Sequence, residues 1–105
     1  MSAQTTQIAQ TALADRIIIV TGAASGIGKG IATRLAADGA TVIVADLDAQ
    51  KSEETAAALG NGSIGIATDV TDRAAVDAMT AEVIDRFGRI DTLVNNAGWD
   101  KVEPF

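Results

Sequence analysis

The stretch IIIVTGAASGIG, residues 17–28, is the part of the sequence that most constrains the fold. Its β-branched run is typical of a short buried strand, and three glycines follow it at spacings of four and two. From Gly26 on, apolar residues recur four apart, as they do on one face of a helix. They are Ile27, Ile31 and Leu35, with Ala32 and Ala36 beside them. The stretch therefore predicts a strand, a glycine turn and a helix in direct succession.

The rest of the chain repeats this alternation. Strands are expected at 40–46, 63–70 and 89–96, and helices at 48–59 and from Thr71, as the capping residue, to Phe87. The helices should end at glycines, which are Gly39, the GNG at 60–62 and Gly88. The third helix carries an apolar stripe that is expected to face the core, formed by Val76, Met79, Val83, Ile84 and Phe87.

The resulting order, β-α-β-α-β-α-β, predicts an α/β fold with a parallel sheet and helices on both faces. This is the pattern of a Rossmann-type, doubly wound parallel sheet. The polar residues 1–14 are expected to form a flexible amino-terminal extension, and residues 15–105 the folded part, whose role as a dinucleotide-binding half-domain rests on the motifs below.

Composition narrows the possible functions. The chain has 105 residues, 48 % of them hydrophobic, which suits one globular domain with a modest core. The formal net charge is −6 without a basic cluster, so nucleic acid is not expected as a partner. Without cysteine or histidine there is no disulfide, thiol nucleophile, imidazole base or usual zinc site. No apolar run could span a bilayer and no secretory signal is evident, so we expect a cytoplasmic protein without membrane contact.

A strand that feeds a glycine turn and a helix points several free N–H groups at one place beyond the strand. An anion can bind there without Lys or Arg. Gly22 permits the turn, Gly26 leaves room for a pyrophosphate to approach the backbone, and Gly28 lets the helix pack closely on the sheet. The alternative is that these are turn glycines only.

Two other phosphate-binding patterns do not fit this stretch. In a P-loop, the first glycine would fall at Ala23, and Gly30 stands where a Ser or Thr is required. The G-x-G-x-x-G pattern fails because Ala24 and Ile31 occupy its glycine positions.

TGAASGIG at 21–28 and NNAG at 95–98 together resemble the signature motifs of the short-chain dehydrogenase/reductase family. The resemblance runs from about Asp15 to Phe105 with every expected element in register. It implies that five residues line the cofactor's pyrophosphate and nearby ribose, namely Gly22, Ser25, Gly26, Ile27 and Gly28. It also places Asn96, Ala97 and Gly98 beside the cofactor's ribose, after the fourth strand.

Asp46 closes the second expected strand, 18 residues after Gly28. A carboxylate at that place, with Leu47 beside it, can accept both hydroxyls of the adenine ribose. Family members that prefer the phosphorylated cofactor carry Arg or Lys where Ser25 stands here. Both features predict NAD as the cofactor. The alternative for Asp46 is a solvated acid at a helix start, which is the role expected of Asp48.

Asp69 and Val70 follow the third strand and resemble the family's adenine-edge pair. In that pair a carboxylate binds the exocyclic amine and a backbone N–H binds a ring nitrogen. A plain turn or capping role is the alternative for Asp69. Asn95 is expected to tie neighbouring strands together and not to contact substrate.

The family's chemistry requires a Tyr and a Lys four apart, a Ser and a further Asn, all downstream of the NNAG motif. This sequence ends seven residues after Gly98 and contains no tyrosine, and Lys101 is expected to be a loop lysine. No catalytic residue can therefore be assigned. We expect the 105 residues to be the amino-terminal, cofactor-binding half of a longer enzyme, and to be inactive alone.

The resemblance implies that the parent enzyme is a homo-oligomeric oxidoreductase that moves a hydride between NAD and a small secondary alcohol or ketone. Trp99 and Asp100 faintly resemble the family's alicyclic hydroxyacyl-CoA dehydrogenases, which suggests a hydroxyacyl-CoA as one type of substrate. The alternative is a non-catalytic dinucleotide-binding module or an inactive fragment. A downstream Y-x-x-x-K would decide between the two.

Overall fold

Residues 12–97 are described by the computed structural model, and they form strands and helices in strict alternation. In chain order the elements are β1 (Ile17–Thr21), α2 (Gly26–Ala37), β2 (Thr41–Asp46), α3 (Ala49–Leu59), β3 (Ile64–Ala67), α4 (Arg73–Phe87) and β4 (Thr92–Val94). Every strand and helix expected from the sequence is therefore present.

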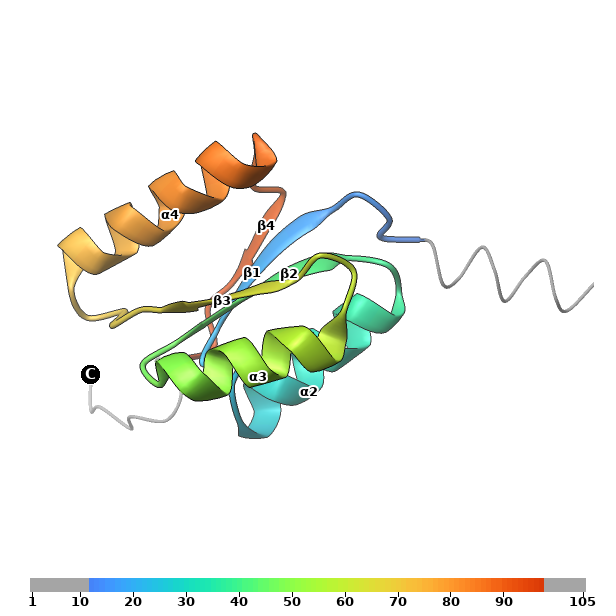
Figure 1. Ribbon diagram of the computed structural model, residues 1–105, viewed down its shortest axis with the longest axis horizontal. Helices are drawn as coiled ribbons and strands as arrows, with labels where there is room; N and C mark the ends of the chain where they lie inside the picture. The colour runs from blue at the N-terminus through green and yellow to red at the C-terminus, as the bar shows by residue number, and fades with distance from the viewer. Residues whose placement is uncertain (1–11, 98–105) are drawn as a thin grey trace, which may run out of the picture.

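The strands form one parallel sheet in the order β3-β2-β1-β4 (Figure 1). β1 lies inside the sheet and pairs with β2 from Ile17 opposite Thr41 to Thr21 opposite Ala45. Its other edge pairs with β4. The chain thus moves outward from β1 through β2 to β3 and then returns to the far side of β1. This is the doubly wound, Rossmann-type α/β sheet that the sequence predicts.

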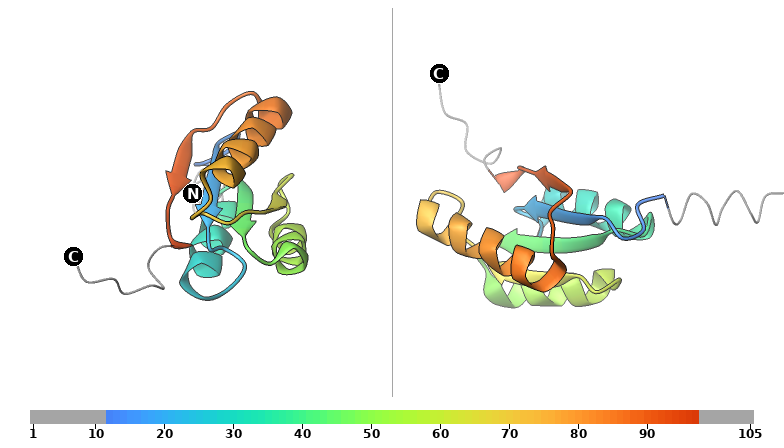
Figure 2. Two further views of the ribbon diagram at one scale, coloured as in Figure 1. Left: turned by 90° about the vertical axis from the view of Figure 1, so that its left-hand side faces the viewer. Right: turned by 90° about the horizontal axis from the view of Figure 1, so that it is seen from above.

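Helices cover both faces of the sheet, with α2 and α3 on one face and α4 on the other (Figures 1 and 2). On the first face, buried valines pack against helix alanines: Val20, Val42, Val44, Ala32, Ala36 and Ala56. On the second, strand isoleucines pack against α4: Ile17, Ile19, Ile43, Met79 and Val83. The small side chains let α3 approach closely, since a Cβ at Gly65 would lie 2.4 Å from the carbonyl carbon of Ser52.

Three strands, β2, β3 and β4, have other bounds than the sequence predicts. β2 begins at Thr41, one residue late. β3 is shorter than the predicted 63–70, because its partner β2 ends at Asp46, opposite Ala67. Beyond that point the N–H of Thr68 donates to the carbonyl oxygen of Asp46 at 2.8 Å and the ladder stops.

β4 is also shorter than the predicted 89–96. The N–H groups of Asn96 and Ala97 donate to the side-chain oxygen of Thr21, at 2.9 and 3.0 Å, and not to the backbone of β1. A side chain therefore ends the pairing after Val94.

The predicted cap of α4 is wrong by one residue. Asp72, not Thr71, is the N-cap, and its carboxylate accepts two N–H groups of the first turn. The Thr71 hydroxyl instead donates to Asp69. Asp48 caps α3 as expected, by accepting the N–H of Lys51 at 3.0 Å.

One residue from each of two apolar helix stripes is exposed. Ile27 is 78 % exposed because it lies in the first turn of α2, beyond the end of β1. Ile84 is 45 % exposed because it lies about 100° around α4 from the buried Val83, and within residues 12–97 no other helix packs on that face of the sheet. Gly39 and Gly88 follow α2 and α4 with positive φ, as predicted for helix ends. None of the described helices is long and apolar enough to cross a membrane.

Candidate cofactor-binding site

The strand order reverses between β1 and β4, because β2 and β3 lie on one side of β1 and β4 on the other. In open parallel sheets, ligands bind beyond the carboxyl ends of the strands at such a reversal. Two turns meet there, residues 22–25 after β1 and residues 95–97 after β4. The candidate site is centred on these two turns.

The side chain of Thr21 joins the two turns. Its oxygen accepts the N–H groups of Asn96 and Ala97, and its hydroxyl donates to Oδ1 of Asn95 at 3.2 Å. Thr21 is 4 % exposed, so these bonds are shielded from water. Asn95 ties neighbouring strands together, as predicted. Thr21 is a positioning residue that sequence reasoning did not single out, although its place between the strand and Gly22 was the available signal.

Three glycines, one in the turn after β1 and two at the start of α2, are required by close contacts or by backbone angles. A Cβ at Gly28 would lie 2.1 Å from the carbonyl oxygen of Gly22 and 2.6 Å from Nδ2 of Asn96. Gly22 has a φ of +65° and Gly26 a φ of +58°, both in the left-handed region. At Gly26 a Cβ would meet nothing within 4 Å. Gly28 therefore packs the start of α2 against the end of β1, and Gly26 borders open space.

α2 begins without a capping side chain. Its N-cap, Ser25, has extended backbone and makes no side-chain bond to the helix, and the first turn contains no acidic residue. Ser25, Gly26 and Ile27 are all exposed. The N–H groups at a helix start have no partner within the helix, and they carry the positive end of the helix dipole. This arrangement can hold an anion such as a phosphate.

Asp46 connects the end of β2 to the glycine turn. Its Oδ2 accepts the N–H of Ala24 at 3.1 Å, and its Oδ1 accepts the N–H of Asp48 at 3.3 Å. The side chain is only partly buried, and Leu47 beside it is 72 % exposed. The carboxylate is therefore held next to the turn after β1, at the carboxyl end of β2.

Asp69 and Val70 lie at the same edge of the sheet, after β3. Oδ1 of Asp69 accepts the N–H and the hydroxyl of Thr71, at 2.9 and 2.6 Å, so a turn-forming role is present. Val70 is half-buried and lines an apolar hollow of about 290 Å³ between the sheet and α4. Gly98 lies outside the described residues. The structure thus brings the other predicted site residues to one edge of the sheet.

The family model described as short chain dehydrogenase matches residues 16–105. The chain belongs to the short-chain dehydrogenase family. This accounts for the co-occurrence in the sequence of the glycine turn and the NNAG motif, of which Asn96 and Ala97 are joined to the turn through Thr21.

Curated relatives share close to half of the aligned residues. A (2S)-[(R)-hydroxy(phenyl)methyl]succinyl-CoA dehydrogenase subunit from Thauera aromatica is 46 % identical over 90 residues, which are 83 % of this chain and 36 % of the relative. Galactitol 2-dehydrogenase from Agrobacterium fabrum is 47 % identical over 85 residues, 81 % of this chain and 33 % of the relative. The chain therefore spans about a third of the length of the relatives it matches.

A solved structure of the same family has the same fold. The 3-ketoacyl-(acyl-carrier-protein) reductase from Brucella melitensis, complexed with NADH, superposes with a TM-score of 0.73 and is 36 % identical. The match covers 77 % of this chain and 33 % of that chain.

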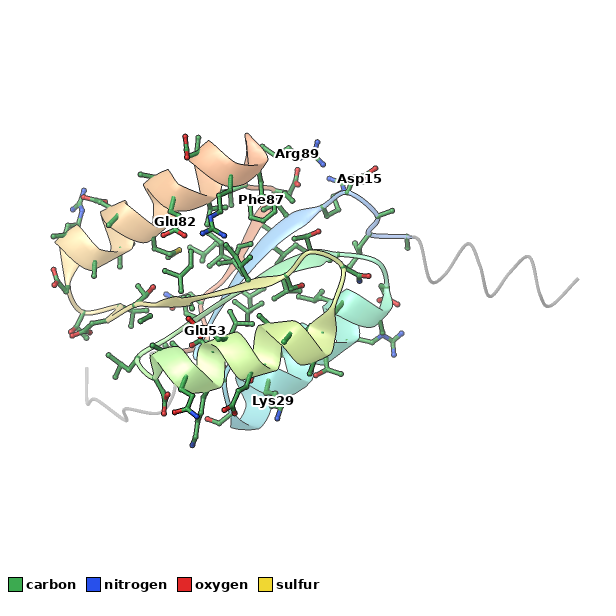
Figure 3. All side chains as sticks on the ribbon, in the orientation of Figure 1. Asp15, Lys29, Glu53, Glu82, Phe87 and Arg89 are labelled. Atoms are coloured by element: carbon green, nitrogen blue, oxygen red, sulfur yellow. The ribbon has the colours of Figure 1, made fainter. Side chains whose placement is uncertain are left out.

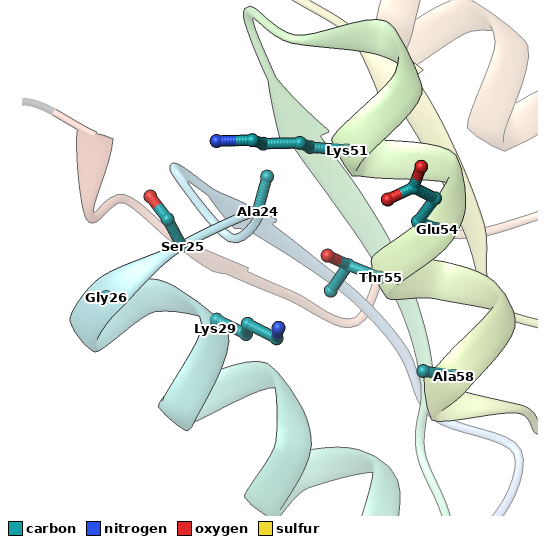
Figure 4. A pocket seen from close by; sticks show the side chains of 8 residues that line it. All are labelled: Ala24, Ser25, Gly26, Lys29, Lys51, Glu54, Thr55 and Ala58. Carbon is teal, nitrogen blue, oxygen red and sulfur yellow. The ribbon is translucent and has the colours of Figure 1, made fainter.

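This short-chain dehydrogenase chain also has a cavity that sequence reasoning missed. It has a volume of about 420 Å³ and lies between the start of α2 and one face of α3 (Figure 4). Its lining comprises Ala24, Ser25, Gly26, Lys29, Lys51, Glu54, Thr55 and Ala58. The available signal was the spacing of four in both helices, which puts Ser25 with Lys29 and Lys51 with Thr55. Lys51 lies in a helix as predicted, yet it lines a cavity beside the glycine turn.

A second polar cluster lies at the opposite end of the sheet, at the amino ends of β1 and β4. Asp91 accepts the N–H of Ile17 at 2.8 Å and Nε of Arg89 at 3.0 Å, and Arg89 also bonds the carbonyl oxygen of Asp15 (Figure 3). The hydrogen bond from Ile17, followed by that from Arg89, lowers the pKa of Asp91 below its usual 3.8. This cluster stabilises the sheet away from the candidate site. Among residues 12–97, no group of three or more side chains is arranged to hold a metal ion.

Proposed function

We propose that this chain holds NAD(H) within a short-chain dehydrogenase that transfers a hydride between NAD and a secondary alcohol or ketone. The observation that carries the proposal is the uncapped, exposed start of α2, which lies where the strand order reverses. The solved family member with this fold is complexed with NADH, which supports the choice of a nicotinamide dinucleotide.

The residues suit the parts of the cofactor as follows. The turn after β1 and the start of α2 bind the pyrophosphate and nearby ribose, through Gly22, Ser25, Gly26, Ile27 and Gly28. Asp46 and Leu47 bind the adenine ribose, and Asp69 and Val70 border the adenine. Asn96 and Ala97, at the turn after β4, and Gly98, which follows them in the sequence, bind the cofactor's ribose. The open space at Gly26 is where a phosphate would approach the backbone most closely.

NAD is proposed over NADP because of Asp46. A carboxylate that is fixed beside the turn and partly exposed can accept ribose hydroxyls, and it would repel a phosphate on the 2′ position. Ser25 provides no positive charge at the start of α2.

The substrate class is proposed from what the relatives' names share. Galactitol and a hydroxy(phenyl)methylsuccinyl-CoA differ in size and charge, but both are oxidised as alcohols. Bound NAD supplies the hydride acceptor. The 105 residues contain no tyrosine, histidine or cysteine, so we expect no turnover from this chain alone and expect the catalytic residues in a longer protein. That longer protein is proposed to be a homo-oligomer, as the family resemblance implies.

A titration of NADH onto the protein, followed by NADH fluorescence, tests the binding proposal. Gly26→Ala should weaken binding at least about tenfold, because a methyl group would occupy the space that the phosphate needs. Gly30→Ala is the control in the same helix, since a Cβ there also meets nothing within 4 Å; unlike Gly26, whose φ is +58°, Gly30 has no positive φ, so the melting temperatures of the two variants measure the backbone strain at Gly26. Thermal melting of both variants shows that they fold. Unchanged NADH affinity in a folded Gly26→Ala protein would contradict the proposal.

A further inference from the structure

The turn between α3 and β3 contains an Asn-Gly pair, Asn61 and Gly62. The other asparagines of the chain, Asn95 and Asn96, are not followed by glycine. In an Asn-Gly pair the backbone nitrogen of the glycine can attack the side-chain carbonyl carbon of the asparagine, because no Cβ on the glycine hinders the approach. Both residues of the pair are exposed, and a Cβ at Gly62 would meet nothing within 4 Å, so water reaches them.

The side chain of Asn61 is bound to the end of α2 and the start of the next strand. Its Nδ2 donates to the carbonyl oxygen of Ala36 at 2.7 Å and to that of Ala40 at 3.3 Å. Ala36 lies in the last turn of α2, and Ala40 directly precedes β2. One side-chain amide therefore satisfies two carbonyl groups, which lie 25 and 21 residues away in the chain.

Further hydrogen bonds fix the backbone of the same turn. The Thr41 hydroxyl donates to the carbonyl oxygen of Asn61 at 2.7 Å, and the side-chain oxygen of Ser63 accepts the N–H of Val42 at 2.9 Å. Asn61 has a φ of +56°, in the left-handed region that asparagine tolerates better than most residues. The turn is therefore held in one arrangement, in which Nδ2 of Asn61 is bound to α2.

We propose that Asn61 is a site of spontaneous deamidation, and that the two hydrogen bonds of its side chain suppress the reaction in the folded protein. The Gly62 nitrogen forms a bond to Cγ of Asn61, the Cγ–Nδ2 bond breaks, and ammonia leaves with the proton of the Gly62 N–H. Water then opens the resulting succinimide ring at either carbonyl, which gives aspartate or isoaspartate. The net reaction takes up water and releases ammonia, without oxidation or reduction. Because Nδ2 is the leaving nitrogen, both of its hydrogen bonds must break before it departs.

The product does not fit the native contacts of the turn. A carboxylate at position 61 has no donor for the carbonyl oxygens of Ala36 and Ala40. It also places a negative charge at the end of α2 where the helix dipole is negative. In isoaspartate the main chain runs through the side-chain carbon as well, which lengthens the turn by one backbone atom. Deamidation of Asn61 should therefore destabilise the folded protein.

Mass spectrometry of the tryptic peptide that spans residues 52–73 measures the reaction, because Asn61 is the only asparagine in that peptide. The protein is incubated at mildly alkaline pH, either folded in buffer or unfolded in guanidinium chloride, and samples are digested over time. Replacement of the amide by a hydroxyl raises the mass of the peptide. Asp38 and Gly39 can form the same ring by loss of water, but they lie in another peptide and regain their mass on hydrolysis. The reaction needs no cofactor, so the test is independent of the proposed function.

We expect the unfolded protein to deamidate at least about tenfold faster than the folded one, since two hydrogen bonds must break in the fold. Thr41→Val removes the hydroxyl that binds the Asn61 carbonyl, and should raise the rate in the folded protein. Thr33→Val is the matched control, because the Thr33 hydroxyl donates within α2 to Lys29 and does not contact the turn. Gly62→Ala, measured in the unfolded protein only, should slow the reaction because a methyl group hinders ring closure.

Urea unfolding of two variants at position 61 tests the effect of the product. Asn61→Asp has the side chain of the aspartate product, and its urea midpoint should lie below that of the wild type. Asn61→Gly loses the amide without adding a charge and accepts the positive φ, so its midpoint should fall between the two.

Three results would overturn the proposal. The first is that peptide 52–73 gains no mass in the unfolded protein, and the second is that folded and unfolded proteins react at the same rate. The third is that the folded Thr41→Val and Thr33→Val proteins react equally fast, because the contacts of the turn would then not protect Asn61. An Asn61→Asp protein as stable as the wild type would refute the predicted effect of the product.

Discussion

The Asp46 carboxylate accepts a hydrogen bond from the backbone N–H of Ala24, at 3.1 Å. This bond links the end of β2 to the turn between β1 and α2, so one side chain both fixes the turn and borders the proposed ribose site. Removing Asp46 would therefore change two properties at once. A substitution that keeps an acceptor oxygen but removes the charge separates them.

The first prediction is that the protein binds NAD more tightly than NADP. Two unit charges about 4 Å apart at an effective dielectric near 20 repel by about 4 kcal/mol, and even half of that exceeds a tenfold preference. Asp46→Asn retains an oxygen for the Ala24 N–H but loses the second acceptor, which bonds the N–H of Asp48 at 3.3 Å, so it should narrow the preference for NAD with only a small fall in the melting temperature. Adding Leu47→Arg should narrow it further by supplying a phosphate partner.

Dissociation constants for both cofactors, measured by titration, check this preference. Glu53→Gln is the control, since it removes an exposed carboxylate from α3 without touching the turn. Equal affinity of the unaltered protein for NADP would sink the assignment of Asp46.

The second prediction contrasts two glycines of α2. Gly28→Ala should destabilise the fold by about 3 kcal/mol or more, because its Cβ would lie 2.1 Å from the Gly22 carbonyl oxygen. Gly30→Ala should stabilise it by about 0.5–1 kcal/mol, because the helix gains a better helix former in open space. Urea unfolding measures both. Similar midpoints for the two variants would contradict the close packing at Gly28.

The third prediction concerns the Thr21 hydroxyl. Thr21→Val keeps the shape but leaves the N–H groups of Asn96 and Ala97 without their acceptor, which should cost about 1–3 kcal/mol. Thr21→Ser keeps the oxygen and should recover most of that loss. Hydrogen exchange at the two amides gives a local readout. If their exchange is as slow in Thr21→Val as in the wild type, the hydroxyl does not join the turns.

The fourth prediction is a pH dependence of stability at the opposite end of the sheet. The pKa of Asp91 is lower in the folded protein than its usual value, so its ionised form contributes stability above about pH 4, and that contribution is lost as the pH falls further. Asp91→Asn should therefore be less stable than the wild type at pH 6, with the difference shrinking below about pH 4.

Urea midpoints across this pH range test the effect of Asp91. Asp77→Asn, which removes an exposed ion pair with Arg73 at 3.8 Å, serves as the control and should change stability little. If the urea midpoints of the wild type and Asp91→Asn differ by the same amount from pH 6 to pH 3, ionisation of Asp91 does not cause the difference in stability.

The elements and the glycine turn were predictable because they depend on local properties of the chain. The β-branched run, the helical spacing after Gly26 and the positive φ at Gly22 follow from sterics within a few residues. The cap of α4 was not resolved, because Thr71 and Asp72 are adjacent and both are good capping residues. The geometry favours Asp72, since Thr71 is held by Asp69.

The cavity at Lys29 and Lys51 was not predictable for a different reason. The spacing of four groups Ser25 with Lys29 and Lys51 with Thr55, but whether these two helix faces meet depends on how α3 packs beside α2, which is a tertiary relationship. The same holds for Thr21, whose two N–H partners lie 75 and 76 residues away in the chain. The sequence therefore predicted the turn that faces the proposed cofactor better than it predicted the contacts that hold the turn in place.

The most direct test of the central claim is a map of backbone amide chemical shifts by nuclear magnetic resonance as NAD is added. We predict that the largest shifts at saturation occur at Gly26, Ile27 and Gly28, whose N–H groups begin α2, with smaller shifts at Asp46 and Asn96. Largest shifts elsewhere, for example along α4, or no shift of the three α2 amides at saturating NAD, would contradict it.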